Sequence, residues 1–504
     1  MSSSSLAAAA AAFLLAVAMS CHCHVARGWG GLGVNYGTVA DDLPTAARSV
    51  ELLRAAGAGA VRIYDANADI LRALAGTGVP VSVTVPNDAI PSLAAAASPA
   101  AADEWVARNL APHIPAARVV CLLVGNEVLS DRATAGTAWP SLVPAMANLR
   151  RALSARGLGR VKVGTTLAMD ALGASYPPSA GAFRDDIAGA VVRPLLEFLN
   201  ATGSYYFVDA YPYFAWAANH RSISLDYALF QGEASTHYVD PGTGLTYTNL
   251  FDQMLDAVVA AMARLGYGNV KLAVSETGWP TAGDADELGA NVHNAATYNR
   301  NLAARMAKNP GTPARPGAEI PVFLFSLYNE NRKPGPGTER HWGLYYPNAT
   351  WVYEVDLAGR RPAASYPPLA PTPPAPVQDG TPVWCVLAGG GEAANETAVT
   401  AAVEYACRQR SGTCAAIEAG GECNQPDTLA AHASYAFNAY WQLFRKAGGT
   451  CYFNGLAEKT TKDPTFALRS KHAKPFVNLQ CDRAVPSLVE FRVSALNCAQ
   501  KQNV

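Results

Sequence analysis

The region from Leu32 to about Gly359 alternates short apolar runs with amphipathic or alanine-rich stretches. This alternation is typical of a parallel β-sheet whose strands are joined by crossover helices. Eight runs can be counted, and they begin at Leu32, Ala60, Val79, Arg118, Arg160, Tyr205, Val270 and Pro321. Eight such units predict an α/β fold, the (β/α)8 or TIM barrel. A doubly wound open sheet is the alternative, but no glycine-rich phosphate loop follows the first run, which weakens it.

Nearly every run ends in a polar or aromatic residue. The carboxyl ends of all barrel strands open on one face, so these side chains are expected to line one cleft. They are Asn35, Tyr36, Tyr64, Asp65, Asn87, Asp88, Asn126, Glu127, Tyr211, Glu276, Trp279, Asn329 and Glu330. Carboxylates and amides suit sugar hydroxyls, and aromatic rings suit the apolar face of a pyranose. The composition therefore favours a carbohydrate cleft, although any single aromatic residue could instead pack at the barrel rim.

Two glutamates, Glu127 and Glu276, end the fourth and seventh runs. A carboxylate at the end of an apolar strand is directed into the barrel mouth, where two of them can flank one scissile bond. A retaining glycosidase needs two carboxyl groups about 5–5.5 Å apart, one protonated and one ionised. A structural ion pair is the competing interpretation of a strand-end glutamate.

The motifs GVNYG, VGNEV, DAYPYFAW, SETGWP and YNENRKPGPGTERHWGLYYPN occur in order between Leu32 and Val355. In these motifs the chain resembles the plant endo-1,3-β-glucosidases, which are retaining β-1,3-glucanases with a (β/α)8 barrel. The resemblance implies that Glu127 is the acid/base and Glu276 the nucleophile, with Lys333 and Glu339 supporting the pair. It also implies sugar contacts from Tyr36, Asn126, Tyr211, Phe214 and Trp279.

Alternatives to this interpretation remain at two levels. A surface ion pair is the alternative role for Lys333 and Glu339. A catalytically silent wall protein that binds callose, a 1,3-β-glucan, is the alternative for the whole chain.

The charge balance bears on the partners of the protein. Lys and Arg number 39 against 40 for Asp and Glu, giving a net charge of -1. Such a surface offers no electrostatic footprint for nucleic acid or an anionic membrane, so a neutral polymer, 1,3-β-glucan, is the expected partner. The two-carboxylate chemistry requires no metal or organic cofactor, and we expect a monomer.

Residues 1–28 are predicted to be a secretory signal peptide. The stretch MSSSSLAAAAAAFLLAVAMS is apolar but short for a membrane span, although it lacks an early Lys or Arg. Cleavage after Ser20 and cleavage near Gly28 are both compatible with the sequence. Glycosylation sequons at Asn200, Asn348 and Asn395 fit secretion. We expect an extracellular, wall-associated protein; a lipid anchor at the outer plasma membrane is the alternative, which the polar C-terminus disfavours.

The predicted domains after the signal are a barrel over residues 30–358, a proline-rich linker over 359–380, a cysteine-rich module over 381–481 and a divergent tail over 482–504.

Seven cysteines between Cys385 and Cys498 indicate a disulfide framework in a small, mainly helical domain, with connectivity undetermined. The module resembles the callose-binding module that follows the barrel in many of these plant enzymes. It departs from that pattern because its last cysteines are Cys481 and Cys498, and an odd count leaves one thiol over. Its helical aromatics could contact glucan or form the core: Tyr435, Phe437, Tyr440 and Trp441.

Overall fold

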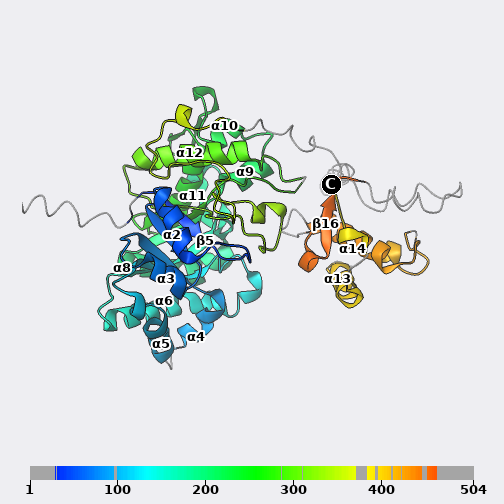
Figure 1. The fold of residues 1–504 in the computed structure, drawn as a ribbon, viewed down its shortest axis with the longest axis horizontal. Helices are drawn as coiled ribbons and strands as arrows, with labels where there is room; N and C mark the ends of the chain where they lie inside the picture. The colour runs from blue at the N-terminus through cyan, green and yellow to red at the C-terminus, as the bar shows by residue number, and fades with distance from the viewer. Residues whose placement is uncertain are drawn as a thin grey trace, which may run out of the picture. The chain divides into compact units, whose positions relative to one another are not determined.

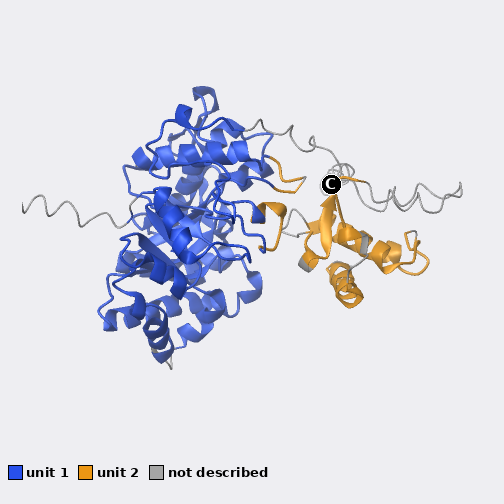
Figure 2. Cartoon of the chain, in the orientation of Figure 1, with its two compact units in different colours: residues 1–282, 289–332, 340–372 blue, residues 283–288, 333–339, 373–504 orange. Residues whose placement is uncertain are grey.

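The computed structural model describes residues 29–462, apart from 30, 96–98, 285, 309, 370–382, 392–394, 410–411, 422 and 445–450. The predicted signal peptide, half of the linker (370–380), the end of the cysteine-rich module with Cys481, and the divergent tail with Cys498 lie outside the described residues. Two compact units are distinguished (Figure 2): residues 1–282, 289–332 and 340–372 form one, and residues 283–288, 333–339 and 373–504 form the other. No described helix is both long and apolar enough to cross a membrane.

The first unit contains a closed barrel of parallel strands in the order β1-β14-β11-β8-β5-β4-β3-β2. This confirms the predicted (β/α)8 barrel and excludes the open doubly wound sheet. Each of the eight apolar runs contains one barrel strand. The strands are β1 (Gly33–Tyr36), β2 (Ala60–Ile63), β3 (Pro80–Val85), β4 (Arg118–Asn126), β5 (Lys162–Ala168), β8 (Tyr205–Asp209), β11 (Lys271–Thr277) and β14 (Val322–Leu324).

The crossover helices surround the barrel (Figure 1). The principal ones are α2 (Ala46–Ala55), α3 (Ala68–Leu74), α4 (Ile90–Ala94), α5 (Pro99–Asn109), α6 (Ala138–Ala155), α8 (Arg193–Thr202), α11 (Leu250–Arg264) and α12 (Val292–Lys308). Shorter helices are α7 (Asp185–Ile187), α9 (Pro212–Ala218) and α10 (Leu225–Ala228). Side-chain caps begin several of them: the Thr45 hydroxyl accepts from the Arg48 amide at α2, and Asn249 caps α11 in the same way. Each cap satisfies a backbone amide that has no partner within its helix.

The loops of the barrel contain short two-stranded antiparallel sheets. They are β6 (Leu172–Ala174) with β7 (Ala182–Phe183), β9 (Tyr238–Val239) with β10 (Thr246–Tyr247), and β12 (Gly311–Thr312) with β13 (Arg315–Pro316).

The barrel interior is a packed core near the starts of the strands. Trp29, Cys121, Leu123, Phe207 and Phe323 are buried together, and the rings of Trp29 and Phe323 meet edge to face at 5.3 Å. Burial raises the pKa of the Cys121 thiol to about 12, so Cys121 stays neutral and packs as a small hydrophobic side chain. The strand starts are therefore filled with apolar groups, and polar chemistry is left to the strand ends.

The second unit contains an antiparallel pair, β15 (Trp384–Leu387) with β16 (Ala457–Thr460), and two helices, α13 (Glu396–Arg408) and α14 (Leu429–Phe444). Disulfides join Cys385 to Cys451 and Cys407 to Cys414, and Cys423 is also disulfide-bonded. These bonds constrain a unit whose apolar core is small.

Candidate active site

Glu276 lies near the end of β11 and is 6% exposed. Its Oε1 accepts hydrogen bonds from Arg62 Nη1 at 2.7 Å and from the Tyr64 hydroxyl at 2.6 Å. Its Oε2 accepts from the Tyr211 hydroxyl at 2.8 Å. Three donors from two strands, β2 and β8, and the residues that follow them therefore fix the orientation of one carboxylate, as expected for a group that must attack along a defined direction.

Arg62, in the middle of β2, is completely buried. Besides Glu276, its guanidinium donates from Nη2 to Asn126 Oδ1, and its Cζ lies 4.6 Å from the centre of the Tyr64 ring. Burial opposes the charge, but Tyr64, Glu276 and Asp209 outweigh burial and raise the pKa of Arg62. Arg62 is a residue of the candidate site that the sequence interpretation missed. The available signal was a single charged residue inside an otherwise apolar run, which needs a buried partner.

Glu127 directly follows β4 and is half-buried. Its backbone is left-handed, with φ of 49°, and its amide donates to the Thr166 carbonyl at 3.0 Å. A non-glycine residue in this region costs roughly 1 kcal/mol and persists only where the surroundings enforce it, which is common at active sites. Gly125, two residues earlier, has φ of 77°, and a Cβ there would lie 2.4 Å from Val128 Cγ2. Glycine at 125 thus permits the sharp turn that presents Glu127.

Asn126 directly precedes Glu127 and is joined to Glu276 by hydrogen bonds through Arg62. Its Oδ1 accepts from Arg62 and, at 2.9 Å, from the Thr166 hydroxyl. Its backbone exchanges two hydrogen bonds with the Asn87 side chain, at 2.7 and 2.9 Å. The side-chain oxygen of Asn126 therefore already accepts two hydrogen bonds within the site, and its side-chain nitrogen is the atom left for the predicted sugar contact.

The tyrosines that face Glu276 remain hydroxyl donors over a wide pH range. Burial, followed by the charge of Glu276, raises the pKa of both Tyr64 and Tyr211 well above the ordinary value of 10.0. Tyr64 and Arg62 both come from β2 or its end, so this one strand supplies two of the three donors.

An aromatic wall stands beside Tyr211. The ring centroids of Tyr211 and Trp342 are 5.0 Å apart, and Phe214 packs on both at 5.5 and 5.8 Å. Phe214 is 47% exposed while Trp342 is buried. Phe214 is therefore accessible from solvent, and the buried Trp342, which the sequence interpretation did not single out, packs against it; the sugar contact of Phe214 stays a prediction.

Tyr36 and Trp279 lie in the interior. Tyr36 is 3% exposed and donates to the Ser49 hydroxyl at 2.9 Å. Trp279 has no exposed surface, and its indole donates to the Gly289 carbonyl at 2.8 Å. Because a sugar cannot reach either ring in this structure, we assign both to packing beneath the site, in contrast to the expected sugar contacts.

Lys333 and Glu339 lie in the segment after β14. This segment is bound to the one after β11: Gly337 N donates to Asp284 Oδ2 at 2.9 Å, and the Thr338 hydroxyl donates to Glu287 Oε1 at 2.6 Å. Both segments group with the second unit. The support that Lys333 and Glu339 give to the catalytic glutamates stays a prediction.

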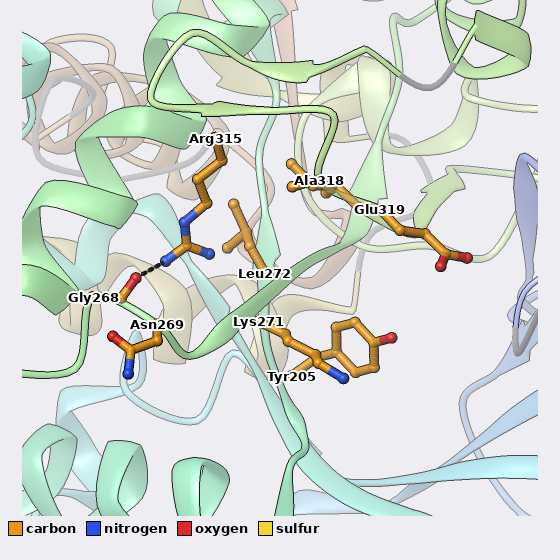
Figure 3. A pocket seen from close by; sticks show the side chains of 9 residues that line it. Tyr205, Gly268, Asn269, Lys271, Leu272, Arg315, Ala318 and Glu319 are labelled. Atoms are coloured by element: carbon orange, nitrogen blue, oxygen red, sulfur yellow. Dashed lines mark hydrogen bonds between the residues drawn. The ribbon is translucent and has the colours of Figure 1, made fainter. Parts of the chain in front are cut away.

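A pocket of about 320 Å³ lies at the opposite ends of the strands (Figure 3). Tyr205 and Lys271, which line it, are the first residues of β8 and β11, whereas Glu276 lies near the end of β11. Arg315 also lines it, but its guanidinium is bound to the carbonyls of Gly268 and Val270 at 2.5 and 2.8 Å. The pocket is therefore separate from the candidate active site.

Comparison with known families decides what kind of site this is. The model of glycosyl hydrolases family 17 matches residues 32–357. The chain belongs to glycosyl hydrolase family 17. It is thus a glycoside hydrolase, and the resemblance found in its motifs is confirmed. A second model, the X8 domain, matches residues 383–458.

Curated relatives of this family 17 chain match most of its length. The probable glucan endo-1,3-beta-glucosidase A6 of Arabidopsis thaliana is 48% identical over 435 residues, which cover 86% of this chain and 89% of the relative. A glucan endo-1,3-beta-D-glucosidase of Olea europaea is 36% identical, with 86% and 92% covered.

Solved structures match the barrel. A beta-1,3-glucanase and allergen of Cryptomeria japonica pollen has 40% identity and a TM-score of 0.61, covering 65% of this chain and 99% of its own. A plant beta-glucan endohydrolase has 41% identity and a TM-score of 0.59, covering 64% of this chain and 100% of its own.

The X8 unit divides its aromatic residues between core and surface. Phe437 and Trp441 are buried, and Tyr435 and Tyr440 pack partly buried against the same core. Tyr405, which the sequence interpretation did not single out, is 50% exposed, and its ring centroid lies 5.8 Å from that of Tyr440. Among the described aromatic rings of this unit, Tyr405 is therefore a candidate for contact with a sugar.

Proposed function

We propose that this family 17 enzyme hydrolyses internal 1,3-β-glucosidic bonds by a double displacement, with Glu276 as nucleophile and Glu127 as acid/base. The observation that carries the assignment is the trio of hydrogen bonds from Arg62, Tyr64 and Tyr211 to the Glu276 carboxylate. Such an array holds an anion in one orientation, which a nucleophile needs. Glu127 has the opposite setting: it is half-buried beside a strained turn, open to a leaving group or to water.

In the first step the Glu276 carboxylate attacks the anomeric carbon while Glu127 donates its proton to the glycosidic oxygen. The bond between the anomeric carbon and that oxygen breaks, which releases the leaving chain with a new hydroxyl and leaves a glycosyl ester on Glu276. In the second step Glu127 removes a proton from water as the water oxygen attacks the anomeric carbon and frees Glu276. Two inversions give net retention.

Support for the 1,3-β linkage comes from similarity. The curated relatives are named as glucan endo-1,3-beta-glucosidases, at identities up to 48%. The test is product analysis after digestion of laminarin, callose and a mixed-linkage 1,3;1,4-β-glucan. The proposal predicts early internal cleavage of laminarin and callose, seen as a rapid fall in chain length, with released ends initially in the β configuration. A preference for the mixed-linkage polymer would contradict it.

The X8 unit supplies a second attachment to the same polymer, and the enzyme acts outside the cell in the wall. The match to the X8 domain supports the attachment, and the apolar N-terminal sequence, the sequons and the disulfides support the location. A fluorescent fusion expressed in plant cells tests the location after plasmolysis. Fluorescence that stays with the wall supports the proposal, whereas fluorescence in the cytosol contradicts it.

A further inference from the structure

Asp209, a third carboxyl group, lies next to Glu276 and has no part in the double displacement. It is the last residue of β8, and in the parallel pairing with β11 its Cα partner is Glu276. The Ala210 amide that follows it donates to the Glu276 carbonyl at 2.9 Å. The register of β11 shifts between Val274 and Glu276, so Asp209 lies where the strand is irregular.

The contacts of Asp209 are few. Its Oδ1 accepts from the Ser275 hydroxyl at 2.6 Å, and its Oδ2 is buried with no hydrogen-bond partner among the described residues. The side chain is only 2% exposed. Ser275 directly precedes Glu276, and its carbonyl accepts from Asn35 Nδ2 at 3.0 Å and from Arg62 Nη1 at 3.3 Å. Through Ser275, Asp209 therefore helps hold the backbone from which Glu276 projects.

The charged and titratable groups around Asp209 come from four barrel strands or their ends. They are Arg62 and Tyr64 at β2, Glu127 after β4, Tyr206 and Tyr211 at β8, and Glu276 on β11. Arg62 is the cation near Asp209, but it forms its ion pair, at 2.7 Å, with Glu276 and not with Asp209. An ionised Asp209 would be a second buried anion beside Glu276 with one oxygen unpaired, and burying an anion without partners costs far more than burying a neutral acid.

Electrostatics agree with this geometry. Burial first, then the charges of Glu276 and Glu127, raise the pKa of Asp209 well above its ordinary value, while Arg62 and the Ser275 hydroxyl only partly oppose the rise. The neutral state is thus compatible with an ionised Glu276 next to it.

We infer that Asp209 is a positioning residue that works as a neutral carboxylic acid. It holds Ser275, and with it the part of β11 where the register shifts just before Glu276. Its neutrality leaves Glu276 as the one anion that Arg62 must balance on this side of the site. The kinetic consequences of this inference rest on the proposed role of Glu276 as nucleophile. The protonation state of Asp209 does not, because it can be measured without catalysis.

The kinetic test compares Asp209→Asn with Asp209→Ala and Ser275→Ala in the full chain. Asparagine is neutral, and its amide oxygen can still accept from Ser275. We therefore expect kcat/KM of Asp209→Asn within about threefold of wild type and both limbs of its pH profile within about 0.3 units. Both alanine variants should lose about tenfold in kcat with KM unchanged, because the lost hydrogen bond positions Glu276 and touches no sugar.

The opposite charge state predicts a different profile. If Asp209 were ionised in the active enzyme, Asp209→Asn would remove a negative charge, lower the pKa of the remaining carboxyls and move both limbs to lower pH by about one unit or more. That shift, or an Asp209→Asn variant as impaired as Asp209→Ala, would overturn the inference.

A spectroscopic measurement keeps the test independent of folding defects and of catalysis. Wild-type protein labelled with ¹³C at aspartate carboxyls should show the infrared carbonyl band of a protonated acid at pH 7, and Asp209→Asn should lack that band. If no such band exists in the wild type, Asp209 is ionised and the inference fails. If the band is present but Glu276 variants retain turnover, the proposed function fails and the charge state of Asp209 stands.

Discussion

Arg62 and Glu276 form a 2.7 Å ion pair inside the barrel, between strands that are not neighbours in the sheet. The Arg62 side chain has no exposure and that of Glu276 has 8%. Removing one partner of such a pair leaves a buried charge uncompensated, whereas an exposed pair loses little. The pair therefore links the stability of the barrel to the orientation of its proposed nucleophile.

Arg62→Met should lower both stability and activity. The buried Glu276 carboxylate loses its cation, so we expect a loss of about 3–5 kcal/mol in the free energy of unfolding. The measurement is urea unfolding together with kcat on laminarin. Arg48→Met is the matched control, because Arg48 pairs with Glu51 at 2.9 Å with both side chains more than half exposed. The control should change stability by about 0–1 kcal/mol. Equal effects of the two variants would show that the buried pair is not important.

Tyr211→Phe should lower kcat/KM by about tenfold or more, because it removes one hydrogen bond to a charged carboxylate, worth about 1.5–3 kcal/mol, and keeps the ring. Tyr36→Phe is the control, since the Tyr36 hydroxyl donates to Ser49 in the core and does not contact Glu276 in the described structure. That variant should change stability without changing kcat/KM. If Tyr36→Phe impaired turnover as much as Tyr211→Phe, the hydrogen bond to Glu276 would not explain the effect.

The pH dependence of stability should differ between two aspartate variants. The folded pKa of Asp209 lies above its unfolded value, so the folded protein binds this proton more tightly and loses stability as pH rises from about 4 toward the folded pKa. Asp209→Asn lacks this loss, so its Tm relative to wild type should increase from pH 3.5 to 7.

Asp103→Asn provides the opposite case. The hydrogen bond from Arg156 lowers the pKa of Asp103, so that carboxylate stabilises the fold above its unfolded pKa and the contribution is lost on acidification. The Tm of Asp103→Asn relative to wild type should therefore fall slightly over the same range. Parallel pH profiles for both variants would contradict the assigned pKa shifts.

The X8 unit should matter for solid substrate alone. A chain ending near Ala370 keeps Glu127, Glu276, Lys333 and Glu339, so it should cleave soluble laminarin at close to the full rate. Its turnover of insoluble callose should fall, because a second attachment raises the effective concentration of enzyme on the polymer. Unchanged pull-down on insoluble glucan after truncation would show that the unit does not bind it.

A single exposed ring can be tested in the full chain. Tyr405→Ala should weaken pull-down on insoluble glucan, whereas Leu443→Ala, at 39% exposure on the same unit, should not. Equal retention by both variants would remove Tyr405 from the binding surface.

The barrel and its glutamates could be predicted because each depends on local sequence. A strand of apolar residues ending in a polar one is visible in a run such as that before Glu127, and eight repeats of that pattern specify a closed barrel. Arg62 was visible as a charge within an apolar run, but its partners lie 64 and 214 residues away, and only the closed fold brings them together. Tyr36 and Trp279 were placed in the cleft because strand-end residues can turn either toward the mouth or into the packing, and the sequence does not distinguish these directions.

The most direct test of the account is chemical rescue at the two glutamates. Glu276→Gly should abolish turnover and regain it with azide, giving a glycosyl azide of inverted configuration, because the small anion enters the space of the missing nucleophile. The fold should tolerate Glu127→Gly, since a φ of 49° suits glycine. In this variant azide should give a glycosyl azide of retained configuration. An inverted azide product from Glu127→Gly would reverse the two roles and contradict the account.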